Sequence, residues 1–302
     1  MKLDTRMPVT NLQPRPGIGR RLIGLYQLSH PLPTAMWVVA ITLFSLVAAA
    51  AAHRPPQIWK LLLVMVGIGC AYTAIGAAND YFDQELDAKR TDKPIPQGLV
   101  TPGHAIALAV ATTVGVVAAF ASLGLVPLLL GLLIEGMGMS YNVGLKRTIA
   151  SGLVFAVWFP IIPFLAWTVF GVWQPFLPWL VVAGAALGIE INVSNTVPDL
   201  EDDIPQGVRG LAHTLGLQRS LALTWIVPIA LVTLFWILDL TGRVPAHPVG
   251  LAVATVAAVA STAAAAALVA RRPIRSRLRS AFIIQTVGAL VLAASWMAAA
   301  AL

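Results

Sequence analysis

Long stretches without charged residues constrain this chain more than any other feature. Of its 302 residues, 58% are hydrophobic and only 11% are charged, whereas a soluble domain carries about 25% charged residues. A helix needs about 20 mainly apolar residues to cross a bilayer, and in lipid it satisfies its own backbone groups. Strands of a membrane barrel would be shorter and would alternate in polarity. The chain is therefore predicted to be an all-α, polytopic membrane protein.

Nine segments are long and apolar enough to be transmembrane helices. We expect them to form one integral-membrane domain over residues 1–302, in which residues 1–22 are a flexible cytoplasmic tail. The predicted spans are residues 33–52, 59–81, 104–123, 126–142, 150–170, 176–198, 219–239, 247–269 and 280–301.

Basic residues divide unevenly between the two ends of these spans. With nine spans, the N-terminus and alternate loops share one side, which holds 17 of the 20 lysines and arginines; only Arg54, Lys60 and Arg243 lie on the other. Positive-inside bias predicts a cytoplasmic N-terminus and an external C-terminus in a bacterial inner membrane. The positive excess thus indicates topology and contact with anionic lipid, and no nucleic-acid partner is expected.

Acidic residues gather at two places, each at the cytoplasmic end of a predicted span. Of the 13 acids, nine lie in these two clusters. The same spacing occurs in both, at an offset of 116 residues: Asn79, Asp83 and Asp87, then Asn195, Asp199 and Asp203. Four spans separate the members, so we predict two four-helix pseudo-repeats around a central cavity, followed by a ninth helix.

Helix geometry turns each cluster into a polar stripe, because residues four apart lie on one face. Tyr72 extends the first stripe into the membrane, and Asn192 extends the second. Asp202 continues the second stripe beyond Pro198, which either kinks the helix or begins a new helical turn. Polar side chains at membrane depth avoid lipid, so both stripes are expected to face the cavity.

The clustered oxygen ligands suit Mg²⁺, which takes one or two carboxylates and shares the rest of its shell with water and substrate phosphates. We therefore predict a diphosphate held through Mg²⁺, with two ions expected. Lysine and arginine stabilise charge on a departing phosphate oxygen. The nearby basic residues are Lys89, Arg90, Lys93, Lys146, Arg147 and Arg209.

Other polar and aromatic residues within the spans allow two interpretations each. Tyr72 and Tyr141 are placed to present an aromatic face to a cation, although Tyr141 also fits the membrane interface. Glu135 shares a helix face with Asn142 and Lys146, so it either contacts an acceptor as a ligand or base, or forms a helix–helix hydrogen bond. We favour a structural role for Glu190. His30 is interpreted as an interfacial residue, with proximity to an acceptor as the alternative.

Motifs in order along the chain resemble those of a known family. "NDYFDQELD" has the form N-D-x-x-D-x-x-x-D, and "KPIPQG" stands where the family has R-P-[LI]-P-x-G. "YNVGLKR" is similar to Y-x-x-x-L-K-R, and "NTVPDLEDDIPQGVRGLAHTLG" is similar to a later D-x-x-x-D segment. Together with nine helices, the chain from about residue 23 to its end resembles the UbiA superfamily of intramembrane prenyltransferases.

This resemblance implies Mg²⁺-dependent transfer of an isoprenyl group from an isoprenyl diphosphate to a hydrophobic, aromatic acceptor, through an allylic carbocation. The implied catalytic residues are Asp80, Asp83, Asp199, Asp203 and Lys146. The predicted metal ligands are Asn79, Asp80, Asp83, Asp87, Asp199, Asp202 and Asp203. The predicted substrate contacts are Asn79, Tyr72, Lys93, Arg90, Tyr141, Asn142, Lys146, Arg147, Asn192, Asn195, Arg209 and Glu135.

Two departures from the family pattern matter. Lys93 replaces an arginine, which removes a bidentate fork but keeps the charge. The usual threonine-leucine pair is displaced in "GVRGLAHTLG", so no role is carried over to His213 or Thr214. Two other functions stay open: a membrane terpene cyclase that needs no acceptor, and an ion-coupled secondary transporter, since transporters also use internal repeats.

Overall fold

The computed structural model describes residues 17–88 and 90–302, so Lys89 and the expected tail up to residue 16 lie outside the described residues. Within these ranges the chain forms helices and no strand, and nine helices are long and apolar enough to span a membrane. The all-α prediction with nine spans is confirmed. The α-helices are α1 (Ile18–Leu28), α2 (Pro31–Ala51), α3 (Ile58–Phe82), α4 (Pro102–Ala121), α5 (Leu125–Val143), α6 (Ser151–Phe170), α7 (Leu177–Thr196), α8 (Leu200–Asp203), α9 (Leu211–Leu240), α10 (Pro248–Arg271) and α11 (Arg275–Ala301).

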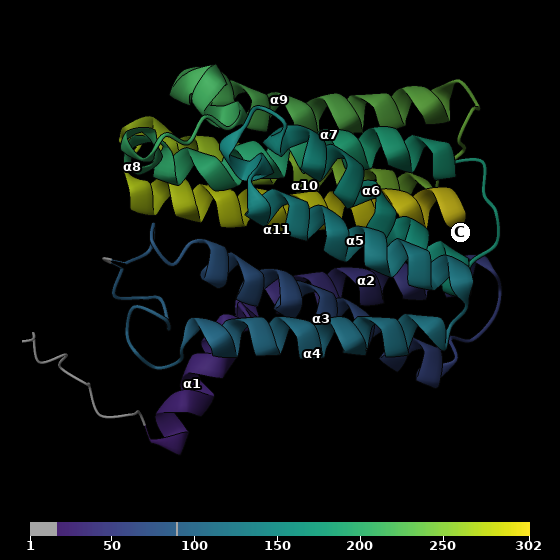
Figure 1. Ribbon diagram of the computed structural model, residues 1–302. Helices are drawn as coiled ribbons and strands as arrows, with labels where there is room; N and C mark the ends of the chain where they lie inside the picture. The colour runs from purple at the N-terminus through teal and green to yellow at the C-terminus, as the bar shows by residue number, and fades with distance from the viewer. Residues whose placement is uncertain (1–16, 89) are drawn as a thin grey trace, which may run out of the picture.

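The spanning helices run side by side as a bundle (Figure 1). The loop after α3 lies at the same end of the bundle as α8, and the C-terminus lies at the opposite end. Helix α3 packs against α2, α4 and α5, whereas α7 packs against α6, α9 and α11. The two acidic motifs therefore follow the second helix of each four-helix unit, α2–α5 and then α6, α7, α9 and α10.

Two spans begin earlier than the apolar pattern predicts. Helix α9 starts at Leu211 and α11 starts at Arg275, where the sequence predicts spans from 219 and 280. The first turns of α11 carry Arg275, Arg277 and Arg279, which an apolar count excludes, and the first turns of α9 carry the polar residues His213, Thr214 and Gln218. Gly216 interrupts the start of α9 with φ of 72° and ψ of 168°. This conformation is accessible to glycine, and the helix changes direction there.

Helix α1 is an element that the sequence did not predict, because its 11 residues are too few to span a membrane. Its Ile18, Leu22 and Tyr26 form an exposed apolar stripe, while Gly24 and Leu28 are buried against the protein. Figure 1 shows α1 lying across the direction of the bundle near the end that carries α8. An amphipathic helix in this orientation is typical of the membrane interface.

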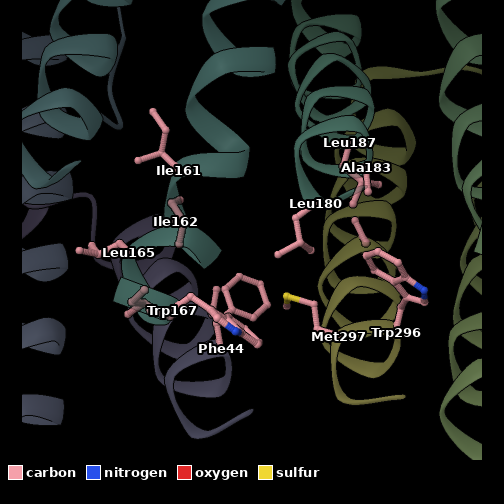
Figure 2. Packing of buried hydrophobic residues seen from close by; sticks show 14 of the residues in the cluster. Phe44, Ile161, Ile162, Leu165, Trp167, Leu180, Ala183, Leu187, Trp296 and Met297 are labelled. Carbon is pink, nitrogen blue, oxygen red and sulfur yellow. The ribbon is translucent and has the colours of Figure 1, made fainter. Parts of the chain in front are cut away.

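The main hydrophobic core lies between α2, α6, α7 and α11. Figure 2 shows Leu180 and Met297 pointing toward Phe44 and Trp167 across this space. Trp296 stacks on Phe235 with ring centroids 4.0 Å apart. Because lipid is as apolar as these side chains, close packing rather than exclusion of water holds the helices together.

Helices α6 and α7 are in close backbone contact at Gly188. A Cβ atom at this position would lie 2.2 Å from the carbonyl oxygen of Phe155. Backbone atoms cannot rotate away from such a contact, so Gly188→Ala should destabilise the protein by about 1–3 kcal/mol, as overpacking does. Thermal unfolding of the purified protein in detergent measures the effect.

Gly136 in α5 provides the matched control, because a Cβ there would meet nothing within 4 Å. Gly136→Ala should leave the protein equally stable or stabilise it by about 0.5–1 kcal/mol, since glycine disfavours a helix interior. Equal melting temperatures for Gly188→Ala and wild type would contradict the close approach of α6 and α7.

Candidate active site

The first acidic motif is built where α3 ends against α5. Asp83 caps the C-terminus of α3, and its backbone N–H donates to the carbonyl oxygen of Asn79 (2.9 Å). The Asn79 side-chain amide donates to Asp83 Oδ2 (2.8 Å) and to Asn142 Oδ1 (3.2 Å). Asn142 in turn donates to the carbonyl oxygen of Ile75 (2.8 Å). These bonds hold the motif rigidly at the junction of two helices.

Lys146 adds a positive charge to this motif. It lies in the 3₁₀ turn Leu145–Arg147 after α5, and its ammonium group forms an ion pair with the carboxylate of Asp83. The side chains are 14% and 13% exposed, respectively, so water screens the pair only partly. The structure thus brings together predicted residues that are distant in sequence. Asn79 contacts Asn142, and Asp83 contacts Lys146.

Asp80 and Asp87 of the same motif are turned toward the loop that follows α3. Asp80 Oδ1 contacts His30 Nε2 (3.0 Å) and Lys93 Nζ (2.5 Å). Asp87 Oδ2 lies 3.5 Å from Lys93 Nζ, and its Oδ1 lies 3.5 Å from Arg90 Nη1. Asp80 therefore does not share the surface formed by Asn79 and Asp83, although sequence proximity placed it in the same metal set.

Arg90 connects this loop to both motifs. Its guanidinium donates to both carboxylate oxygens of Asp92 (3.0 and 2.6 Å), which lowers the pKa of Asp92 to about 2. The pKa of Arg90 is raised, first by the hydrogen bond to Asp92 and further by the charges of Asp87 and Asp199. Because Asp199 belongs to the second motif, Arg90 lies within electrostatic range of both motifs.

The second motif follows a change of helix type after α7. Pro198 lies in the 3₁₀ turn Val197–Asp199, after which α8 begins. Of the two alternatives for Pro198, the structure shows the start of a new helical turn. Asp199 directly precedes α8 and Asp203 is its last residue, and Asp203 Oδ2 is 3.5 Å from His213 Nε2 at the start of α9.

Arginines from α11 contact the second motif. Arg275 forms ion pairs with Asp199 and with Asp202, the latter at 2.6 Å, and Arg279 Nη2 lies 3.6 Å from Asp199. Sequence reasoning assigned these arginines to topology and lipid contact and missed this arrangement. Their spacing of four residues, which places both on one helix face, is the signal that would have found them.

Tyr141 and Lys146 lie within electrostatic range of both motifs. The Tyr141 side chain lies beside Asn192 and within electrostatic range of Asp83 and Asp203. The positive charge of Lys146 acts on Asp203 as well as on Asp83. Carboxylates from the end of α3 and from α8 therefore both lie within electrostatic range of Lys146, after the end of α5.

A row of aromatic rings leads from Tyr141 into the bundle. The ring of Tyr141 meets Phe155 edge to face at 5.3 Å, and Phe155 meets Trp158 at the same centroid distance. Trp158 stacks on Tyr72 (5.4 Å), which stacks on Trp37 (5.0 Å). Sequence reasoning chose the two tyrosines but none of the nine tryptophans and ten phenylalanines, which it interpreted as mostly lipid-facing or core residues.

The remaining predicted residues differ in their surroundings. Arg147, Asn195 and Arg209 are exposed, and the backbone N–H of Arg209 donates to the carbonyl oxygen of Arg147 (3.0 Å). Glu135 is buried and accepts a hydrogen bond from Thr113 of α4, which is the helix–helix alternative. Glu190 is fully buried in α7 and has no hydrogen-bond partner within the described part of the chain.

The donor set fits Mg²⁺ that is completed by a substrate. Within the described ranges, no three His, Cys, Asp or Glu side chains converge tightly enough to hold a metal by themselves. The acidic groups instead stand in two sets, with the amides of Asn79 and Asn195 preceding them. Mg²⁺ commonly takes only one or two carboxylates and binds substrate phosphates with the rest of its shell, so the arrangement suits a metal–diphosphate complex.

These features define a helical membrane protein with a two-sided site of carboxylates and cations at one end of the bundle. Residues 38–287 match the UbiA prenyltransferase family, and the chain belongs to this family. It is therefore a membrane-embedded prenyltransferase, and family membership decides against the secondary transporter.

Individual relatives agree with this assignment. Over 203 residues the chain is 30% identical to the digeranylgeranylglyceryl phosphate synthase of Halobacterium salinarum, covering 67% of this chain and 72% of that protein. It is 30% identical to the protoheme IX farnesyltransferase of Methylorubrum populi over 40% of this chain and 39% of the relative. The fold is similar to that of a UbiA homolog from Archaeoglobus fulgidus solved with GPP and Mg²⁺, with a TM-score of 0.66, 15% identity and coverage of 91% and 99%.

Proposed function

We propose that the protein transfers an isoprenyl group from an isoprenyl diphosphate to a hydrophobic, aromatic acceptor and releases pyrophosphate. The position of Lys146 carries the proposal, because this cation pairs with Asp83 of the first motif and its charge also acts on Asp203 of the second. Aromatic rings begin beside the same point at Tyr141. Ionisation of an isoprenyl diphosphate requires a site that binds the charged diphosphate next to an apolar interior for the isoprenyl chain.

Use of Mg²⁺ is supported by the Archaeoglobus fulgidus homolog, which was solved with GPP and Mg²⁺ and again with DMAPP and Mg²⁺. When bound, Mg²⁺ neutralises the diphosphate and the charge that develops on leaving pyrophosphate. The residues proposed to hold it are Asn79, Asp83, Asp87, Asp199 and Asp203. We propose two ions, one for each motif.

The chain's own cations would stabilise the leaving group. Lys146 and Arg90 lie within range of both motifs, and Arg275 lies against the second. Fixed positive groups that face a departing oxygen stabilise the transition state without reorganising. Lys146 is the most enclosed of the three, with 14% of its side chain exposed, so we expect it to contribute most.

The aromatic row would stabilise the allylic carbocation that remains when the bond between the isoprenyl carbon and the diphosphate oxygen breaks. Faces of tyrosine and tryptophan attract a cation within about 6 Å of the ring centroid. Tyr72 and Trp158 are buried, and Phe155 joins them to Tyr141. Rings in this position would stabilise the allylic carbocation while the apolar helices around them exclude water, which would otherwise quench it.

The orientation of the protein in the membrane is also a proposal. The end of the bundle that carries both motifs holds the basic residues that contact them, including Lys146, Arg90 and Arg275. Positive-inside bias places this end in the cytoplasm and the C-terminus on the other side of a bacterial inner membrane.

The decisive experiment incubates purified protein in lipid with Mg²⁺ and geranyl, farnesyl or geranylgeranyl diphosphate. Acceptors should include a phenol, a quinone precursor, a prenylated glyceryl phosphate and protohaem, since the relatives are named for unlike products. Pyrophosphate release that depends on the aromatic acceptors supports the proposal. Release with a cyclic hydrocarbon and no acceptor would identify a terpene cyclase, and no turnover at any chain length would refute the proposed transfer.

Arg275 offers a test of the part of the site that the sequence missed. Arg275→Met leaves Asp199 and Asp202 without their strongest positive neighbour. We expect kcat/KM for the diphosphate to fall by about tenfold, the effect of one charged contact worth about 1.4 kcal/mol. Arg272→Met, which removes an exposed arginine before α11, should leave kcat/KM within about twofold. Equal effects of the two substitutions would reduce Arg275 to a lipid contact.

A further inference from the structure

Asp80 has a different environment from the other residues of its motif. Its side chain is only 2% exposed, and Oδ1 contacts both His30 Nε2 at 3.0 Å and Lys93 Nζ at 2.5 Å. These partners come from two separate segments, the α1–α2 junction and the loop between α3 and α4. Asn79 and Asp83, its neighbours in the motif, instead face Asn142 and Lys146 of α5 and its following turn.

His30 is held in an unusual backbone conformation. It has φ of 46° and ψ of 62°, the left-handed region that residues other than glycine rarely adopt. Its ring lies directly over Gly76 of α3, where a Cβ would be 3.0 Å from the ring. Such a conformation persists only when its surroundings hold it, and here Asp80 and the surface at Gly76 do so.

Lys93 fastens the loop in a similar way. The carbonyl oxygen of Lys93 accepts from the backbone N–H of Gln97 (3.2 Å), which makes Lys93 the first residue of a compact turn. The end of this turn, Leu99 and Val100, packs under α1, because a Cβ on Gly24 would lie 2.7 Å from Val100 and 2.9 Å from Leu99. Helix α1, the loop and α3 are therefore joined around Asp80.

We infer that Asp80 is a positioning residue rather than a metal ligand. It ties the loop of residues 90–100 and the α1–α2 junction to α3, and so fixes Arg90 beside the two motifs. Lys93, whose ammonium group is committed to Asp80 and Asp87, serves as the tether of the loop. The consequence for catalysis rests on the proposed prenyl transfer, but the tether itself does not.

Hydrogen exchange of the full-length protein in detergent, without substrate, tests the tether. Asp80→Asn keeps the size of the side chain but removes the charge that holds Lys93. Amides of residues 91–100, including those of Gln97, Gly98 and Leu99, should exchange about tenfold faster. Asp83→Asn, the matched substitution on the other face of α3, should leave this exchange at the wild-type rate. Asp80→Asn/Lys93→Met should exchange only slightly faster than Asp80→Asn, because both changes break the close Lys93–Asp80 contact and the second adds only the loss of the 3.5 Å contact between Lys93 and Asp87.

The affinity for a metal ion is a second test of the inference. Mn²⁺ with inorganic pyrophosphate, followed by electron paramagnetic resonance, should bind less tightly to Asp83→Asn, by about tenfold or more. Binding to Asp80→Asn should weaken by a smaller factor. Unchanged loop exchange in Asp80→Asn, or loss of Mn²⁺ equal to that in Asp83→Asn, would overturn the inference.

Two further variants cover the case in which Asp80→Asn does not fold. His30→Gln and Lys93→Met each remove one partner of Asp80 from a partly exposed position. Faster exchange of residues 91–100 in Lys93→Met supports the tether, and wild-type exchange in both variants refutes it. Neither hydrogen exchange nor Mn²⁺ binding requires prenyl transfer. An inactive wild-type protein would therefore refute the proposed function without deciding the role of Asp80.

Discussion

Replacing Asp83 by alanine is expected to reduce prenyl transfer by at least about 10²–10³-fold, the effect of losing one transition-state electrostatic contact. Asp83 is bonded to Asn79, pairs with Lys146 and faces the second motif through Tyr141. Its loss removes a proposed metal ligand and leaves Lys146 without its carboxylate. Initial rates at saturating Mg²⁺ and isoprenyl diphosphate measure the effect.

Glu85 supplies the control for this substitution. It lies two residues further along the same segment and is exposed, so Glu85→Gln removes the same charge outside the site. Its rate should stay within about twofold of wild type, because exposed charges are screened by solvent. Both variants should remain monodisperse with unchanged helicity, which would show that a lower rate comes from lost catalysis and not from unfolding. Turnover near wild type in Asp83→Ala would remove Asp83 from the site.

Replacing Asp199 by alanine should have a comparably large effect, again at least about 10²-fold. Asp199 begins the second motif and is held by Arg275 and Arg279 of α11. If each motif binds one ion, Asp199→Ala should also raise the Mg²⁺ concentration for half-maximal rate. Rates measured over a range of Mg²⁺ concentrations show both effects.

Glu201→Gln is the matched control, because Glu201 lies in the same segment and is exposed. It should keep the wild-type rate and the wild-type Mg²⁺ dependence. Near-normal activity in both Asp83→Ala and Asp199→Ala would refute the two-motif metal site. A large loss in Asp83→Ala alone would leave the first motif as the only metal site.

Periodicity allowed the sequence to predict the pairing of the two motifs. Asn79, Asp83 and their counterparts 116 residues later recur at spacing four, and such residues share a helix face wherever the helix lies. The nine spans were predictable for a similar reason, since the length of an apolar run relates directly to bilayer thickness. The contact between Asn79 and Asn142 was not predictable, because 63 residues separate them.

Adjacent residues in one motif have different contacts that sequence could not separate. Asp80 follows Asn79 directly, but one step along a helix turns a side chain by about 100°. This rotation takes Asp80 away from Lys146 and toward His30 and Lys93. For Arg275 the sequence predicted a contact with lipid, but the structure shows an ion pair with the second motif.

The sequence by itself determined a membrane-spanning, all-helical chain, the position of both acidic motifs and the family to which they belong. These features depend on local composition and on spacing along one helix, and both are fixed before any helix packs. Only the tertiary structure decided which side chains meet: Lys146 with Asp83, Arg275 with Asp199, and Asp80 with His30. Such contacts depend on the rotation and packing of helices distant in sequence, which no single segment specifies.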